Sequence, residues 1–224
     1  MQAVILAAGL GLRLRPLTDT IPKAMIKIGE QPIIDHILNA LPDSIEEIYV
    51  VIGHLGDQIR EHLGDSWNQI PIHYVQQSEL TGTGSALHLI RDQLHDRFLV
   101  VNGDDLYAKV DLERLVEQAP AMLVFETRGP APSTIEVDEQ DRMTGIRSNP
   151  DENETILRNT GAYCLDERFF DYPLHEITVH NKTEYSLPHT FLNLAEDIPV
   201  QVVRATKWLP IGNPEELERA RVNT

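Results

Sequence analysis

Two glycines and two cations gather near the start of the sequence. Gly9 and Gly11 come directly after the apolar run AVILAA. Arg13 follows the second glycine by two residues, and Lys23 lies ten residues further on. Main-chain N–H groups in a glycine-rich turn, helped by nearby cations, form a cradle for phosphate groups. Because the whole chain has a net charge of −16, this gathering of cations indicates a small anionic ligand that binds locally.

The glycine pair does not fit two familiar phosphate-binding motifs. In the dinucleotide fingerprint G-x-G-x-x-G the third glycine would stand at Leu14, and a P-loop would need G-K-S/T after the glycines. A purely structural turn remains an alternative, but a turn by itself does not require the flanking Arg13 and Arg15. The segment therefore favours a phosphate loop of another kind.

Two further polar segments follow apolar runs. FLVVNGDDLY ends in the carboxylates Asp104 and Asp105, and IHYVQ is followed by QQSELTGTGSAL, which contains Gln77. Carboxylates beside a polyphosphate repel it unless a cation lies between them, so the pair predicts a Mg²⁺ site, with a solvated turn as the alternative. The amide of Gln77 has a donor and an acceptor side by side.

The elements that must position these residues alternate between strands and helices. Runs rich in Val and Ile predict strands at 3–8, 47–53, 72–76 and 98–103. Apolar residues at helical spacing predict helices within 31–41, 55–63 and 83–94, and Asp111 is expected to cap a further helix. This alternation predicts an α/β fold with a mostly parallel sheet flanked by helices. Ligands of such sheets bind at the carboxyl ends of the strands, here the loops after Ala8, Gly53, Gln76 and Gly103.

The second half of the sequence has a different pattern. From about residue 121, strands are joined by turns with little helix between them, until Asn213 and Pro214 mark a helix start. No linker, repeat or low-complexity segment divides the chain. We therefore expect a single domain over 1–224, with a first half at 1–120 and a β-rich second half at 121–224.

Composition and charge exclude some partners. The negative charge argues against nucleic acid, and no apolar run approaches the roughly 20 residues of a membrane helix. The N-terminus MQAVILAAG lacks the pattern of a secretory signal, and the single cysteine, Cys164, is expected to be a buried core residue. These features predict a cytoplasmic protein without nucleic-acid or membrane partners. Whether it forms a homo-oligomer stays open.

The opening segment as a whole resembles a family signature. L-A-A-G-x-G-x-R-x-R-P-L-T, followed by P-K, is similar to the signature of the sugar-1-phosphate nucleotidyltransferases, most of all the N-acetylglucosamine-1-phosphate uridylyltransferase type. The resemblance implies a Rossmann-like mixed sheet with a nucleotide-binding first half and an acceptor-binding second half. It implies catalytic roles at the phosphates for Arg13 and Lys23. It also implies nucleotide binding by Ala8, Gly9 and Gly11.

Later segments extend the resemblance. QQSELTGTGSAL is similar to the base-recognition segment of the uridylyltransferases, which implies nucleotide binding by Gln77, Gly82 and Thr83. In such a segment the donor and acceptor of the Gln77 amide suit the N3–H and O4 edge of uracil and, after a flip, cytosine. The resemblance favours UTP, while dTTP, GTP and CTP stay open. In the family the aspartate directly after the strand-end glycine binds Mg²⁺, and it corresponds to Asp104. The segments NTGAY and TEYSL match acceptor-binding positions of the family, which implies roles for Asn159, Thr160, Gly161 and Glu184.

The acceptor side departs from the family pattern. The frequent W-x-D-I-G, whose aspartate is a second metal ligand, reads WLPIG with Pro210, and the frequent E-K-P reads S-N-P at 148–150. We expect transfer of UMP from UTP to a sugar 1-phosphate, giving a UDP-sugar and pyrophosphate, with a non-standard phosphorylated acceptor as an alternative. A glycosyltransferase and a non-catalytic nucleotide-binding regulatory subunit also stay open, and Pro210 favours the latter. The given sequence has no hexapeptide repeats, so we expect no acyltransferase activity.

Overall fold

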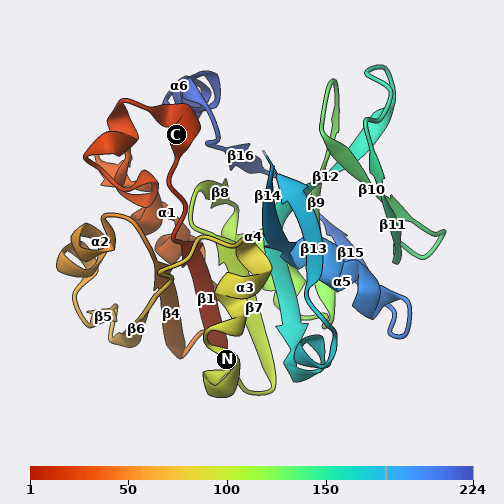
Figure 1. The fold of residues 1–224 in the computed structure, drawn as a ribbon, viewed down its shortest axis with the longest axis horizontal. Helices are drawn as coiled ribbons and strands as arrows, with labels where there is room; N and C mark the ends of the chain where they lie inside the picture. The colour runs from red at the N-terminus through yellow and green to blue at the C-terminus, as the bar shows by residue number, and fades with distance from the viewer. Residues whose placement is uncertain (180, 224) are drawn as a thin grey trace.

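An eight-stranded sheet forms the centre of the molecule (Figure 1). The computed structural model describes residues 1–179 and 181–223. The strand order is β15-β9-β12-β7-β1-β4-β6-β5. The strands are β1 (Gln2–Ala7), β4 (Glu47–Ile52), β5 (Ser66–Trp67), β6 (Ile70–Gln76), β7 (Arg97–Asn102), β9 (Ala121–Arg128), β12 (Thr155–Asp166) and β15 (Gln201–Arg204).

The strands predicted in the first half form the parallel core of this sheet. β1 pairs in parallel with both β4 and β7, and β4 pairs in parallel with β6. Alternate residues of β1 enter two different apolar clusters, with Ile5 on one face of the sheet and Val4 on the other. Because both faces are buried, these strands are nearly continuous runs of Val and Ile. The predicted mostly parallel sheet is confirmed.

Helices cover both faces of the sheet, which confirms the predicted α/β class. The cluster that contains Ile5 receives side chains from α1 (Ile33–Ala40), α2 (Gly56–Leu63), α4 (Lys109–Val116) and α6 (Pro214–Asn223). The cluster that contains Val4 receives them from α3 (Thr83–His88) and α5 (Leu187–Ala195). Within residues 1–179 and 181–223, no helix combines the length and the apolar character needed to cross a bilayer.

The β-rich second half extends the same sheet rather than forming a layer of its own. β12 runs antiparallel between β7 and β9, and β15 runs parallel to β9. Shorter two-stranded sheets pair β2 (Lys27–Ile28) with β3 (Gln31–Pro32), β8 (Asp105–Tyr107) with β16 (Trp208–Pro210), β10 (Ser133–Val137) with β11 (Met143–Ser148), and β13 (His175–Val179) with β14 (Lys182–Ser186). The β10–β11 hairpin rises beside the sheet as an arm (Figure 1). Cys164 is fully buried in β12, as predicted, and burial raises the pKa of its thiol to about 12.

Asp111 is not the helix cap that the sequence predicts. α4 begins at Lys109, so Asp111 lies within its first turn, where its side chain is fully buried. Its carboxylate accepts hydrogen bonds from the main-chain N–H of Thr206 at 2.7 Å and of Lys207 at 3.2 Å. The hydroxyl of Thr206 donates to the same oxygen at 2.9 Å. The buried carboxylate therefore fixes the segment that leads into β16.

We predict that Asp111→Ala lowers the free energy of unfolding by about 3 kcal/mol, because the donors of Thr206 and Lys207 lose a buried, charged acceptor. Urea denaturation of the variant and the wild type measures this loss. Asp92→Ala is the control, since the Asp92 side chain is 83% exposed and pairs with Arg91 at the surface. Its effect should stay within about 0.5 kcal/mol. Equal losses in the two variants would contradict the anchoring role of Asp111.

Candidate active site

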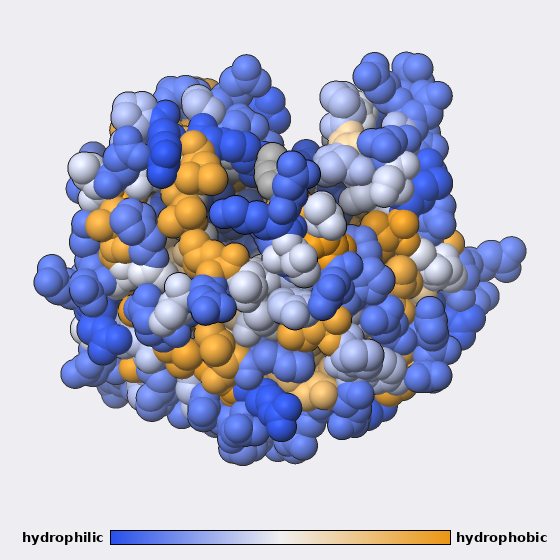
Figure 2. Space-filling model, viewed as in Figure 1, coloured by the Kyte–Doolittle hydropathy of each residue, from blue (hydrophilic) through white to orange (hydrophobic). Residues whose placement is uncertain are grey.

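The carboxyl ends of the parallel strands open into a hollow in the surface. β4, β1 and β7 are neighbours that run in one direction, so the loops that follow them meet at one edge of the sheet. Figure 2 shows the surface hollowed between two lobes. One lobe holds α6 and the segment that follows β1, and the other is formed by the β10–β11 arm. The loops predicted to line the site therefore border a cleft.

The chain that leaves β1 is tightly packed between its neighbours. Ala8 is buried, and a Cβ atom at Gly53 would lie 2.5 Å from the main-chain oxygen of Ala8. A Cβ atom at Gly103 would lie 2.8 Å from the Cβ atom of Ala7. Real Cβ atoms do not approach other atoms so closely, so glycine is needed after both β4 and β7. The two glycines therefore leave room for Ala7 and Ala8, after which the glycine loop begins.

Gly9 and Gly11 lie in the loop directly after β1. Gly11 has a left-handed backbone conformation with a φ of 62°. Its carbonyl oxygen accepts a hydrogen bond from the Thr18 hydroxyl at 2.9 Å and another from the Leu14 N–H at 2.8 Å. These bonds close the segment into a compact turn that begins at the edge of the sheet.

The two arginines of this segment have different surroundings. Arg15 forms an exposed ion pair with Asp19 at 3.0 Å. Arg13 is exposed and forms no ion pair with any residue that the structure describes. Its guanidinium lies beside Gly212, where a Cβ atom would be 2.9 Å from Arg13 Nη2. Arg13 is therefore the arginine of the pair that is free to bind an anion.

Lys23 and Asp104, which come from two separate motifs, meet directly. Lys23 Nζ forms an ion pair with Asp104 Oδ2, although the two residues are 81 positions apart in the sequence. The side chain of Lys23 is 11% exposed and that of Asp104 is 37% exposed. Partial shielding from water strengthens the attraction between the two charges. The ion pair links the N-terminal segment to the end of β7.

Asp105 and Pro210 face each other in the β8–β16 sheet. Pro210 is the register partner of Asp105. Burial raises the pKa of Asp105 well above its usual value, and the neighbouring Asp104 raises it further. Asn213 is the N-cap of α6, as predicted, because its Oδ1 accepts the N–H of Glu216 at 2.9 Å. The residue opposite the carboxylates is thus a proline, and Asn213 is engaged elsewhere.

The donor set around Asp104 is small. Residues 1–179 and 181–223 contain no group of three or more His, Cys, Asp or Glu side chains arranged to hold a metal ion. Pro210 has no side-chain oxygen to offer. Mg²⁺ is commonly held by one or two carboxylates together with substrate phosphates and water. The partly exposed carboxylate of Asp104 fits a site of that type, with a single aspartate as the protein ligand.

The loop after β6 is docked against the second half of the chain. Gln77 is buried, and its Nε2 donates to the carbonyl oxygen of Gly82 at 3.2 Å. The Thr83 hydroxyl accepts the N–H of Leu187 at 3.2 Å, where α5 begins. Gln77 and Gly82 therefore lie together. The Thr83 side chain holds the start of α5, and its nucleotide contact stays a prediction.

Three of the predicted acceptor residues lie on a bulge of β12. Asn159 Nδ2 donates to the Tyr163 hydroxyl at 2.6 Å, and Asn159 Oδ1 accepts the N–H of Gly161 at 2.9 Å. Thr160 is fully buried, and its hydroxyl donates to the carbonyl oxygen of Leu123 at 2.8 Å. The Thr160 side chain thus shapes the bulge from within, and its contact with the acceptor stays a prediction.

Glu184, the fourth predicted acceptor residue, lies elsewhere. It is half-buried on β14, opposite Ile177 on β13. The next residue, Tyr185, donates its N–H to the carbonyl oxygen of Thr81 at 2.7 Å. Glu184 therefore lies on β14, the strand that is hydrogen-bonded to the loop containing Gln77.

The sequence does not predict two residues, Asn102 and Tyr107, that connect the β12 bulge to β7 and β8. The Tyr107 hydroxyl donates to the carbonyl oxygen of Thr160 at 2.9 Å, across 53 positions of sequence. A Cβ atom at Gly161 would lie 2.0 Å from Asn102 Nδ2, so the bulge packs directly on the end of β7. Asn102 could have been found from its place before Gly103 and Asp104, whereas Tyr107 gives no local signal.

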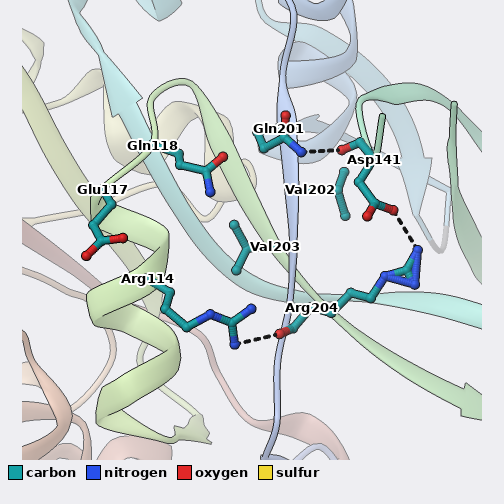
Figure 3. Close-up of a pocket in the computed structure, with 8 residues that line it drawn as sticks. All are labelled: Arg114, Glu117, Gln118, Asp141, Gln201, Val202, Val203 and Arg204. Carbon is teal, nitrogen blue, oxygen red and sulfur yellow. Dashed lines mark hydrogen bonds and ion pairs between the residues drawn. The ribbon is translucent and has the colours of Figure 1, made fainter. Parts of the chain in front are cut away.

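A second hollow, of about 300 Å³, lies between α4 and β15 and is lined by residues other than those predicted for the site (Figure 3). Arg114 Nη1 donates to the carbonyl oxygen of Arg204 at 3.3 Å, and Arg204 Nη2 is paired with Asp141 at 2.6 Å. Because both guanidinium groups are already engaged within the fold, this hollow is less suited to phosphate than the cleft at the strand ends.

Comparison with known proteins places the chain in a family. The sequence profile described as "Nucleotidyl transferase" matches residues 2–224. The chain therefore belongs to the nucleotidyl transferase family of enzymes. This confirms the resemblance drawn from the opening motif.

The relatives align with this chain over most of its length. The UTP–glucose-1-phosphate uridylyltransferase AglF of Haloferax volcanii is 31% identical over 231 residues, which cover 98% of this chain and 95% of AglF. The bifunctional protein GlmU of Methanocaldococcus jannaschii is 29% identical over 222 residues, which cover 98% of this chain and 53% of GlmU. The chain thus spans about half the length of the GlmU relatives that it matches.

A solved structure has the same fold. A Bacillus anthracis protein assigned as a glucose-1-phosphate thymidylyltransferase, in complex with sucrose, superposes with a TM-score of 0.85 over 100% of this chain and 94% of its own. Its sequence identity is 22%, so the likeness concerns the fold alone. The predicted fold class is confirmed by this comparison.

We predict that Gly53→Ala lowers the free energy of unfolding by about 2 kcal/mol, because the added methyl group collides with the main chain of Ala8. Gly9→Ala is the matched control at the same sheet edge, since no atom lies within 4 Å of a Cβ atom there. We expect its effect to stay below about 1 kcal/mol. Urea denaturation compares the two variants. If both lost the same stability, tight packing between Ala8 and Gly53 would be refuted.

Proposed function

We propose that the chain transfers UMP from UTP to a sugar 1-phosphate, releasing pyrophosphate and forming a UDP-sugar, with Mg²⁺ as its cofactor. The observation that carries the proposal is the ion pair of Lys23 with Asp104 beside the glycine loop. A cation and a carboxylate at one strand end suit a triphosphate that binds together with a metal ion. The name of the relative AglF, a UTP–glucose-1-phosphate uridylyltransferase, supports both the sugar 1-phosphate class and UTP.

The proposed chemistry depends on charge stabilisation more than on proton transfer. The phosphate of a sugar 1-phosphate is ionised near neutral pH, so its oxygen attacks the α-phosphorus of the nucleotide without a general base. The bond from the α-phosphorus to the bridging oxygen breaks, and pyrophosphate leaves. Arg13 and Lys23 stabilise the negative charge that builds on the α-phosphate and on the pyrophosphate.

Asp104 is the side chain that would hold Mg²⁺. Lys23 occupies Oδ2 of Asp104, which leaves the other oxygen of a partly exposed carboxylate for a cation. When bound, the ion neutralises charge between the carboxylate and the phosphates. Lys23 can then exchange its contact with Asp104 for a contact with phosphate oxygens.

The orientation of the Gln77 amide supports a base with a donor at its reading edge. Gln77 Nε2 is used by the carbonyl oxygen of Gly82, and Oε1 has no partner among the residues described in the structure. An accepting Oε1 suits the N3–H of uracil or thymine, whereas N3 of cytosine is itself an acceptor. This favours UTP or dTTP over CTP, and the name of AglF favours UTP between them.

A second candidate function rests on Pro210. Because a proline faces Asp105, the site has fewer metal ligands than a site with an acidic residue there. A nucleotide-binding subunit that regulates a partner, without turnover of its own, would need no more. This second candidate function predicts that UTP binds to the protein but that no pyrophosphate is released.

A pyrophosphate-release assay separates the two candidates. UTP, dTTP, GTP and CTP are each combined with glucose 1-phosphate, N-acetylglucosamine 1-phosphate and a panel of other sugar and polyol phosphates. We expect release with UTP and at least one sugar 1-phosphate, and its loss on addition of EDTA. Binding of UTP measured by calorimetry, without release for any acceptor, would support the regulatory subunit and contradict the transferase.

We predict that Lys23→Met and Arg13→Met each lower kcat by about 10²- to 10³-fold, because each removes a fixed charge that faces the transition state. The controls are Lys27→Met, an exposed lysine four residues after Lys23, and Arg15→Met, whose guanidinium is already paired with Asp19. Both controls should keep kcat within about threefold of the wild type.

The circular dichroism spectra of all four variants should match the wild type, as should the urea midpoints of Arg13→Met and the two controls. Unchanged turnover in Lys23→Met and Arg13→Met would remove these two residues from the reaction.

A further inference from the structure

Arg158 directly precedes the β12 bulge, and its guanidinium lies over an aromatic ring. Its Cζ atom lies 4.8 Å from the centroid of the Trp208 ring. Phe125 is the register partner of Arg158 on β9, and its ring centroid lies 6.0 Å from that of Trp208. A guanidinium over an indole face is attracted by the ring, and this contact does not use its N–H groups.

The charge of Arg158 is not matched by a carboxylate. Arg158 is half-buried and forms no ion pair with any residue in the described part of the chain. Arg147 on the neighbouring arm, by contrast, pairs with Glu136 at 2.8 Å and Glu154 at 2.9 Å. In a chain with 35 acidic and 19 basic residues, a half-buried arginine without such a partner points to an anion supplied by a ligand.

The position of Trp208 places this cation near the proposed reaction centre. Trp208 begins β16, whose last residue, Pro210, is opposite Asp105. Two positions further on is Gly212, where an added Cβ atom would lie 2.9 Å from Arg13 Nη2. Four residue steps span at most about 14 Å. One short segment thus has Arg158 at one end and Arg13 at the other.

We propose that Arg158 binds the phosphate of the acceptor, while Arg13 binds the triphosphate. The inference rests on the proposed function and adds a residue that selects for an anionic acceptor. The reaction joins two phosphate-bearing substrates, and it needs two separate cationic positions to bring both phosphates together against their mutual repulsion. The planar fork of a guanidinium matches two phosphate oxygens at once.

Steady-state kinetics test the role of Arg158 in turnover. Arg158→Met keeps a long side chain over Trp208 but removes the charge. We expect the KM for the sugar 1-phosphate to rise about ten- to hundredfold, with the KM for the nucleotide within about twofold of the wild type. The KM of Arg158→Lys for the sugar 1-phosphate should lie between the values for Arg158→Met and the wild type. Arg97→Met, at the opposite end of β7, is the matched control and should leave both KM values unchanged.

Trp208 itself gives a readout that does not need turnover. Trp67 and Trp208 are the two tryptophans, so Trp67→Phe leaves Trp208 as the reporter. Titration with glucose 1-phosphate should change its emission, and the change should vanish in Arg158→Met and with unphosphorylated glucose.

The two experiments separate this inference from the proposed function. An emission change that depends on Arg158, without pyrophosphate release, would support the subsite and contradict the transferase. Pyrophosphate release with an acceptor KM that is equal in the wild type and in Arg158→Met would overturn the subsite alone. If Arg158→Met does not fold, Arg158→Gln replaces it, with the same expected results.

Discussion

At the end of β7, the ammonium of Lys23 and the carboxylate of Asp104 neutralise each other in a partly shielded position. Such a pair is weak support for stability, because the removal of both charges from water offsets much of their attraction. Its consequence is geometric, since it holds the N-terminal segment against the strand end. A triphosphate that arrives with a metal ion meets both members of the pair and can exchange with each. The ion pair therefore holds, without a ligand, the two charges that the proposed reaction needs.

The rest of the cleft is positioned by contacts that join distant parts of the chain. Asp111 fixes the segment before β16, and β16 places Pro210 opposite Asp105. Tyr107, from the strand that pairs with β16, holds the bulge of β12 through the carbonyl oxygen of Thr160. These buried polar contacts therefore connect the proposed nucleotide side to the proposed acceptor side, and a change in them would affect both.

The sequence predicts what depends on local pattern. Parallel strands buried on both faces leave runs of Val and Ile, and β1, β4, β6 and β7 lie where those runs predict them. The glycine loop and the strand-end aspartate are visible because each stands directly after such a run. Asn213 is predicted correctly as a cap, since capping involves only the first turn of its own helix.

Local pattern does not predict which polar side chains form contacts between distant parts of the chain. Asp111 has the residue type of a cap, yet its carboxylate serves donors 95 and 96 positions away. Thr83 lies in a motif that implies a nucleotide contact, and its hydroxyl also accepts the N–H of Leu187 at a sequence distance of 104. Thr160 is likewise drawn into the core by Leu123. A polar side chain can face a ligand or the fold, and only the tertiary contact decides which.

The most direct measurement is a crystal structure of the chain with Mg²⁺ and a non-hydrolysable UTP analogue. The account predicts the triphosphate against the loop from Gly9 to Arg13, with Mg²⁺ between its phosphates and Asp104, and Lys23 within hydrogen-bond distance of a phosphate oxygen. A nucleotide found elsewhere, for instance between α4 and β15, with the Lys23–Asp104 pair undisturbed, would contradict it.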